Sequence, residues 1–195
     1  MDDAAKGGYT DPASLTNIAE AKFFRAYSYF DLVRTYGAVP KIDFKVSTPT
    51  QGNIAKSDTA AIYALINADL TYAEQNLPIV WEAKYAGRAN KWAAKALHAK
   101  VLLQQRNYSQ SLAICRDIIA NGPYSLITDY WKMFKKEGEL CSESIFEIQA
   151  AKTAGDGNTY WSRLGQCQGV RGSGTWDLGW GWNTPTSNLV GTYEA

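Results

Sequence analysis

The sequence predicts a mainly α-helical protein built from helical hairpins, with a loop-rich, irregular lobe at its C-terminal end. Long segments without glycine or proline carry apolar residues at the three- and four-residue spacing of amphipathic helices. Capping and turn residues separate these segments over short distances. Residues 151–195 differ, because they hold nine of the sixteen glycines and four of the seven tryptophans.

The first helix is predicted over residues 12–36. Asp11 and Pro12 are a favourable N-cap and first-turn pair, and Thr16 and Asn17 are alternative caps. Apolar groups occur on both sides of this helix, so we expect it to lie between two neighbours. One stripe holds Phe23, Ala26, Tyr27, Phe30 and Val33, and the other holds Arg25, Tyr29, Leu32 and Tyr36.

Further helices are predicted over residues 57–76, 89–105 and 109–120. The third is rich in alanine, which predicts a close approach of a neighbouring helix at Ala96 and Ala99. Cys115 belongs to the apolar stripe of the fourth helix, so we expect a buried thiol there. The inward-facing residues of the fourth helix are predicted to be Leu112, Cys115, Ile118 and Ile119.

The last two of these helices have the anatomy of a tetratricopeptide repeat. Ala99 is the small residue of the first helix, Tyr108 opens the second helix, and Pro123 ends the unit. The match is partial, because Lys95 and His98 occupy positions where large apolar residues are usual. A tetratricopeptide-like stack of hairpins is implied, because one hairpin cannot bury both of its faces.

The domain organisation is predicted from the change between the helical patterns and the Gly/Trp-rich sequence that follows them. Residues 1–195 are predicted to form a single, partial domain, with a helical hairpin core over residues 12–135. Residues 129–134 are predicted to form a short helix. The region 140–195 is predicted to hold a short strand at residues 144–149, followed by the Gly/Trp-rich loop.

Composition excludes several classes of function. Twenty basic and nineteen acidic side chains leave no field that would attract nucleic acid. No stretch approaches the roughly 18 apolar residues that a membrane span needs. The three cysteines indicate neither a disulfide framework nor a zinc site. With the lone His98 and no GxSxG motif, we predict a binding protein rather than an enzyme, without catalytic residue, cofactor or metal.

The aromatic C-terminal loop is the candidate binding site. Indole faces stack on sugar rings, while neighbouring polar groups bond hydroxyls, as in ligand sites generally. The alternative is that these tryptophans anchor a long loop to the helical core. A glycan-active enzyme is a third and weaker hypothesis, since it needs a demonstrable carboxylate pair. The proposed ring platform is Trp176, Trp180 and Trp182, with Trp161 and Tyr160 as outer candidates; the hydroxyl partners are Arg171, Asp177 and Asn183.

Four segments resemble the SusD/RagB family of outer-membrane lipoproteins, which capture nutrients for a TonB-dependent transporter. Residues 20–40 (EAKFFRAYSYFDLVRTYGAVP) and residues 185–195 (PTSNLVGTYEA) carry the more specific resemblance. Residues 91–126, the alanine-rich hairpin, and residues 142–149 (SESIFEIQ) follow the same order as in that family. Because family members are usually more than twice as long, the chain resembles an internal portion of one.

The resemblance implies a SusD-like fold and a location on the outer membrane, facing the cell surface. It implies that the chain binds an oligosaccharide or other nutrient and passes it to a SusC-like TonB-dependent transporter. Membrane attachment would be only through an N-terminal lipid anchor, which this chain lacks. The alternative function is a helical-repeat scaffold that binds a protein or peptide, and the aromatic loop argues against it.

Overall fold

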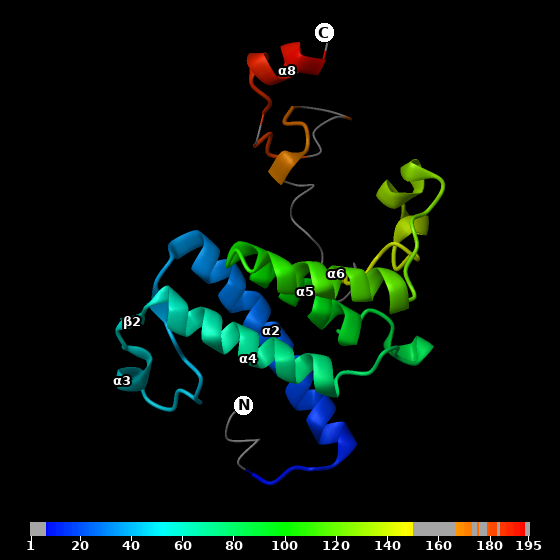
Figure 1. Cartoon of the computed structure of the whole chain (residues 1–195). Coiled ribbons are helices and arrows are strands. Elements are labelled where there is room, and N and C mark those ends of the chain that lie inside the picture. Colours follow the sequence, from blue (N-terminus) through cyan, green and yellow to red (C-terminus); the bar gives the residue numbers. More distant parts are fainter. Residues whose placement is uncertain (1–6, 150–166, 173–174, 176–178, 183, 194–195) are drawn as a thin grey trace. The chain divides into compact units, whose positions relative to one another are not determined.

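The computed structural model describes residues 7–149, 167–172, 175, 179–182 and 184–193. It divides into two compact units, Met1–Glu147 and Ile148–Ala195, here called the helical unit and the C-terminal unit (Figure 1). The predicted mainly α fold is confirmed. The main helices are α2 (Pro12–Tyr36), α4 (Thr59–Asn76), α5 (Lys91–Gln104) and α6 (Tyr108–Asn121). The short elements are β1 (Val39–Pro40), α3 (Pro49–Gly52), β2 (Lys56–Ser57), η1 (Ala83–Tyr85), η2 (Tyr130–Phe134), η3 (Lys136–Gly138) and α8 (Ser187–Tyr193).

Local capping chemistry sets where the helices begin and end. The Ser14 N–H donates to Asp11 Oδ1 (2.9 Å) at the start of α2. The Ala61 N–H donates to Asp58 Oδ1 (2.7 Å) at the start of α4. Side chains of this kind satisfy N–H groups that have no partner within the helix. At the other end of α2, Gly37 has φ 71°, a region that favours glycine, and its N–H bonds to the Val33 carbonyl.

The core lies where α2 packs on α4 and α4 packs on α5, and α6 covers the far side of α5 (Figure 1). Between α2 and α4 the chain forms a two-stranded antiparallel ladder, in which Val39 is opposite Ser57. Removing large apolar side chains from water stabilises this arrangement. The largest apolar side chains that are almost fully buried are Phe23, Ile62, Ile66, Leu70 and Val101.

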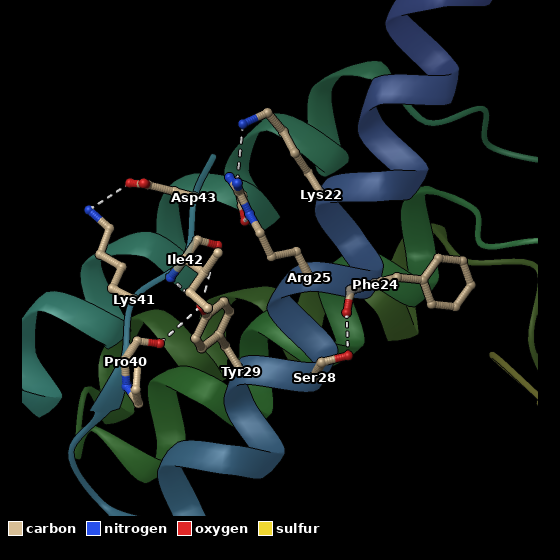
Figure 2. A network of polar contacts seen from close by, with 10 residues as sticks. Lys22, Phe24, Arg25, Ser28, Tyr29, Pro40, Lys41, Ile42 and Asp43 are labelled. Atoms are coloured by element: carbon tan, nitrogen blue, oxygen red, sulfur yellow. Dashed lines mark hydrogen bonds and ion pairs between the residues drawn. The ribbon is translucent and has the colours of Figure 1, made fainter. Parts of the chain in front are cut away.

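Polar contacts join each pair of neighbouring helices. Arg25 of α2 forms two 2.7 Å hydrogen bonds to the carboxylate of Asp69 on α4, and Lys22 reaches the same carboxylate at 3.1 Å. Figure 2 shows Lys22 and Arg25 on successive turns of α2, with Tyr29 bonded to the chain at Pro40 and Ile42. Further links include Glu74–His98 between α4 and α5 and Lys95–Asp117 between α5 and α6.

The predicted burial of α6 was wrong. Ser111 is the buried residue of this helix, and its hydroxyl donates to the Ala99 carbonyl of α5 at 2.9 Å. Leu112 and Ile119 are 51% and 82% exposed, and Cys115 is exposed as well. The spacing of apolar residues identified a helix with one apolar side, but it does not determine whether another element covers that side.

The outer side of α2 also differs from the expectation. Phe23, Phe30 and Val33 are buried as predicted, whereas Tyr27 and Leu32 are each 41% exposed. Of the second stripe, Arg25 and Tyr29 are buried, against Asp69 of α4 and against the chain at Pro40, while Leu32 and Tyr36 remain exposed. In the described part of the chain, α2 is therefore only partly covered on this second side.

The predicted strand at residues 144–149 is absent from the described structure. This segment is anchored by a side chain instead, because the Phe146 ring packs edge-to-face against Phe23 (5.2 Å between centroids) and near Phe24 (6.2 Å). No described strand lies alongside to form a ladder. The short helix predicted at residues 129–134 is the 3₁₀ turn η2. Among the described residues, no helix combines the length and apolarity needed to cross a lipid bilayer.

Candidate ligand-binding site

Two stretches of the C-terminal unit run side by side through backbone hydrogen bonds. The Gly179 N–H donates to the Val170 carbonyl (3.0 Å), and the Gly181 N–H donates to the Gly169 carbonyl (2.9 Å). The Trp182 N–H donates to the Cys167 carbonyl (2.8 Å). These bonds bring the part of the chain before Arg171 next to the part that carries two of the predicted tryptophans.

Trp180 and Trp182 form an exposed pair of indoles. Their ring centroids lie 5.0 Å apart, the ring planes are inclined by 50°, and the residues are 40% and 58% exposed. The segment between them is not a regular extended strand, because Gly181 has φ 67°. The two rings therefore form an angled surface rather than a flat platform.

Arg171 lies directly against Gly181, the residue between the two tryptophans. A Cβ atom placed on Gly181 would come within 2.7 Å of the Arg171 Cβ, so the absence of a side chain at Gly181 permits the close approach. A cleft of about 480 Å³ opens here, lined by Arg171, Trp182, Thr184 and neighbouring residues. One cleft is thus lined by an aromatic, a basic and a hydroxyl-bearing residue, which is the combination expected for a polar ligand with apolar faces.

Of the eight predicted site residues, the structure describes three: Arg171, Trp180 and Trp182. It brings all three together in the C-terminal unit. The others lie outside the described residues, and their part in the site stays a prediction. They are Tyr160, Trp161, Trp176, Asp177 and Asn183.

The structure also exposes aromatic side chains that were predicted only as part of a short helix. Tyr130, Trp131 and Phe134 of η2 are each about two-thirds or more exposed. The sequence signal was present, since DYWKMFKK places three aromatic residues among charged ones. A helix prediction obscured it, because aromatic residues at such spacing usually face a core.

The described residues contain no candidate metal site. No group of three His, Cys, Asp or Glu side chains gathers among them in a way that could hold a metal ion. His98 Nδ1 lies 2.6 Å from Glu74 Oε1, and this pair links two helices. Burial raises the pKa of the Tyr124 hydroxyl, opposed by its hydrogen bond from Asn90. That phenol remains neutral near pH 7.

The comparisons with known proteins agree with this structure. A SusD-like family model described as "Starch-binding associating with outer membrane" matches residues 10–103. A SusD-like protein of Formosa agariphila is 32% identical over 143 residues, which cover 73% of this chain and 27% of that protein. The chain belongs to the SusD-like family.

Solved structures of SusD-like proteins share the fold. A SusD-like carbohydrate binding protein from Bacteroides fragilis superposes with a TM-score of 0.74 at 27% identity, over 88% of this chain and 32% of that one. A laminarin binding SusD-like protein gives a TM-score of 0.72 at 29% identity, over 79% of this chain and 35% of the other. The chain thus spans about a third or less of the length of most SusD-like proteins to which it is similar.

Proposed function

We propose that this SusD-like chain takes part in binding an oligosaccharide at the outer surface of the outer membrane. The observation that carries the proposal is the exposed indole pair of Trp180 and Trp182, of which Trp182 lines a cleft of about 480 Å³ together with Arg171. The indoles would stack on the apolar faces of sugar rings, while Arg171 and Thr184 would bond hydroxyls. The chain acts as a binding protein that leaves the glycan unaltered.

The names of the relatives support the ligand class, and the SusD-like family suggests the partner. One similar structure is titled as laminarin binding, and another as a complex with xylogluco-oligosaccharide. The matching family model names starch and association with the outer membrane. By this likeness the bound oligosaccharide is passed to a SusC-like TonB-dependent transporter, and the ligand is a glucose-based chain. Both statements belong to the proposal for the whole protein.

Isothermal titration calorimetry with laminarin, xyloglucan and amylose fragments tests the site. Trp180→Ala and Trp182→Ala should each weaken binding of the preferred glycan by about 1 kcal/mol, the low end of the range for stacking on aromatic side chains. The loss should appear in the affinity, with an unchanged melting temperature, because both rings are substantially exposed.

Tyr193→Ala is the matched control, since this aromatic residue of the same unit is 85% exposed and lies outside the lining of the cleft. It should leave affinity unchanged. If the variants lacking Trp180 and Trp182 both bind the glycan as tightly as the wild type, the indoles are not the binding surface.

One observation favours the alternative function, a scaffold that binds a protein or peptide. The outer side of α6 exposes Leu112 and Ile119, and an apolar groove of about 300 Å³ runs between α5 and α6 past Ala96 and Cys115. Exposed apolar surface of this kind marks interaction sites. Ile119→Ser would impair a scaffold and leave glycan binding intact, so the calorimetric titrations also separate the two functions.

A further inference from the structure

Three aromatic side chains on a single turn of the helical unit are exposed to solvent. Tyr130, Trp131 and Phe134 of η2 are 72%, 71% and 67% exposed. The Phe134 ring packs edge-to-face with both others, at centroid distances of 5.2 Å to Tyr130 and 6.3 Å to Trp131. The three rings therefore form one continuous surface, which we call the aromatic turn. Contiguous exposed apolar surface of this kind usually has a binding role.

Hydrogen bonds and close packing hold the backbone of the aromatic turn in place. Asp129 Oδ1 accepts a hydrogen bond from the Trp131 N–H (3.1 Å), and the Asp129 carbonyl accepts one from the Lys132 N–H (3.1 Å). Gly138 of η3 sits so close that a Cβ there would lie 2.3 Å from the Lys132 carbonyl. The rings are thus carried by a backbone that is already ordered, which reduces the conformational entropy lost when a ligand binds.

A cleft lined by both polar and apolar side chains shares residues with this turn. It has a volume of about 330 Å³, and its polar lining side chains are Thr128, Asp129, Lys132 and Glu137. Asp129 and Lys132 belong both to this cleft and to the aromatic turn, as cap and as third residue of η2. Hydrogen-bond donors and acceptors of both charge signs therefore stand beside a set of exposed rings.

We propose that the aromatic turn and this cleft form a second carbohydrate-binding surface, separate from the Trp180–Trp182 pair. It would take a short stretch of a polysaccharide chain, with sugar faces on Trp131 and Phe134 and hydroxyls directed to Asp129, Lys132 and Glu137. This inference rests on the proposed function, since it assumes that the chain recognises glycans. It adds a site made of residues of the helical unit, none of which belongs to the predicted loop.

A glycan suits the surface better than a protein partner does. Stable protein interfaces engage roughly 20–30 residues on each side, whereas the exposed rings occupy one turn of five residues. A sugar chain needs only a few rings together with closely spaced hydroxyl partners. The adjoining cleft supplies those partners with both a carboxylate and an ammonium group.

Affinity gel electrophoresis of the whole chain, with laminarin, xyloglucan or amylose cast in the gel, tests the second site. The variants are Trp131→Ala with Phe134→Ala, Trp180→Ala with Trp182→Ala, and all four changes together. Each pair should weaken retention of the best polysaccharide about fivefold or more, and the fourfold variant should lose it, as expected for stacking contacts. Tyr36→Ala, at another aromatic residue that is 73% exposed in the helical unit, should change nothing.

The outcomes separate the two proposals. If no polysaccharide retards the wild type, both the proposed function and the second site are rejected. If the Trp131/Phe134 variant is retained normally while the Trp180/Trp182 variant is not, the second site is overturned and the proposed function stands. Loss confined to the Trp131/Phe134 variant supports the second site and rejects the first. A changed oligomeric state by light scattering, with normal retention, identifies the aromatic turn as a protein contact and overturns the inference. Circular dichroism and the single Trp131→Ala variant control for misfolding.

Discussion

The helical unit and the C-terminal unit use aromatic side chains in opposite ways. Phe23 and Trp92 of the helical core are 1% and 5% exposed, whereas Trp180 and Trp182 keep 40% and 58% of their surface accessible. In the helices, a regular backbone brings apolar residues to one side, where packing stabilises the fold. In the C-terminal unit, Gly181 and a few backbone hydrogen bonds hold rings outside any core.

This difference shows that residue type alone does not separate buried, structural aromatic side chains from exposed ones that are available to a ligand. The residues that surround each aromatic side chain make the difference. Phe23 meets other rings inside the core, while Trp182 meets a second indole at an open cleft. Substitutions in the helices should therefore alter the free energy of unfolding, and substitutions in the aromatic segment should alter affinity.

The largest effect is expected at Asp69, which is 1% exposed and shared by Arg25 and Lys22. Asp69→Ala removes the carboxylate from two cations at the α2–α4 interface. Removing one partner of a buried ion pair costs about 3–5 kcal/mol. We expect a loss of that size in the free energy of unfolding, measured by urea denaturation.

Asp31→Ala is the matched control on the same helix. Asp31 pairs with Arg34 at 2.8 Å, but its side chain is 70% exposed, and exposed pairs contribute about 0–1 kcal/mol. If Asp69→Ala and Asp31→Ala reduce stability equally, the buried cluster does not hold α2 against α4.

The Asp69 cluster shows what sequence periodicity can and cannot predict. The boundaries of the helices followed from caps such as Asp11 and Asp58, because a cap acts within one turn. Asp69 lies among the buried α4 residues Ile66, Leu70 and Ala73, and a carboxylate at such a position signals a buried partner. Which cation supplies it depends on the packing of two helices, and local spacing does not contain that information.

The candidate site shows the same division. Glycine and tryptophan content indicated the stretch in which we propose that a ligand binds, and within it Arg171 lies against Gly181, between Trp180 and Trp182. The positive φ of Gly181 and the pairing of residues 167–170 with residues 179–182 were not predictable, because they depend on contacts across a loop. The exposure of the apolar side of α6 was not predictable for a similar reason. The spacing of apolar residues shows which side of a helix is apolar, but not whether another element covers that side.

The next largest loss of stability is expected from overpacking α5, and its size should differ between the two sides of this helix. Ala94 is fully buried towards the core, and Ala94→Leu should cost about 1–3 kcal/mol through overpacking. Ala99 is 5% exposed but borders the apolar groove of about 300 Å³. Ala99→Leu should therefore destabilise the protein less, since the added carbons have space. Thermal unfolding of the two variants tests this order, and a greater loss for Ala99→Leu would contradict it.

A smaller and local effect is expected at Gly181. An alanine with φ near 67° costs about 1–2 kcal/mol, and its Cβ would meet the Arg171 Cβ. Gly181→Ala should change the near-ultraviolet circular dichroism of the tryptophans and weaken glycan binding, with unchanged helical content. Gly172→Ala, where an added Cβ meets nothing within 4 Å, is the control. Identical spectra for the wild type and Gly181→Ala would show that this backbone does not set the geometry of the rings.

The smallest effect concerns pH at the α5–α6 contact. The Lys95 ammonium, and then the Asn121 amide, hydrogen-bond to Asp117 and hold the pKa of its carboxyl below the ordinary value of 3.8. A carboxyl with a lowered pKa in the folded state contributes stability that is fully present above its unfolded pKa and is lost as pH falls through the folded one. Wild type should therefore melt slightly higher than Asp117→Asn at pH 7, and the difference should shrink below about pH 4. Because the group is exposed, 1 M salt should also reduce the difference. A gap in melting temperature that stays constant from pH 7 to pH 2.5 would mean that the charge of Asp117 does not hold α6 against α5.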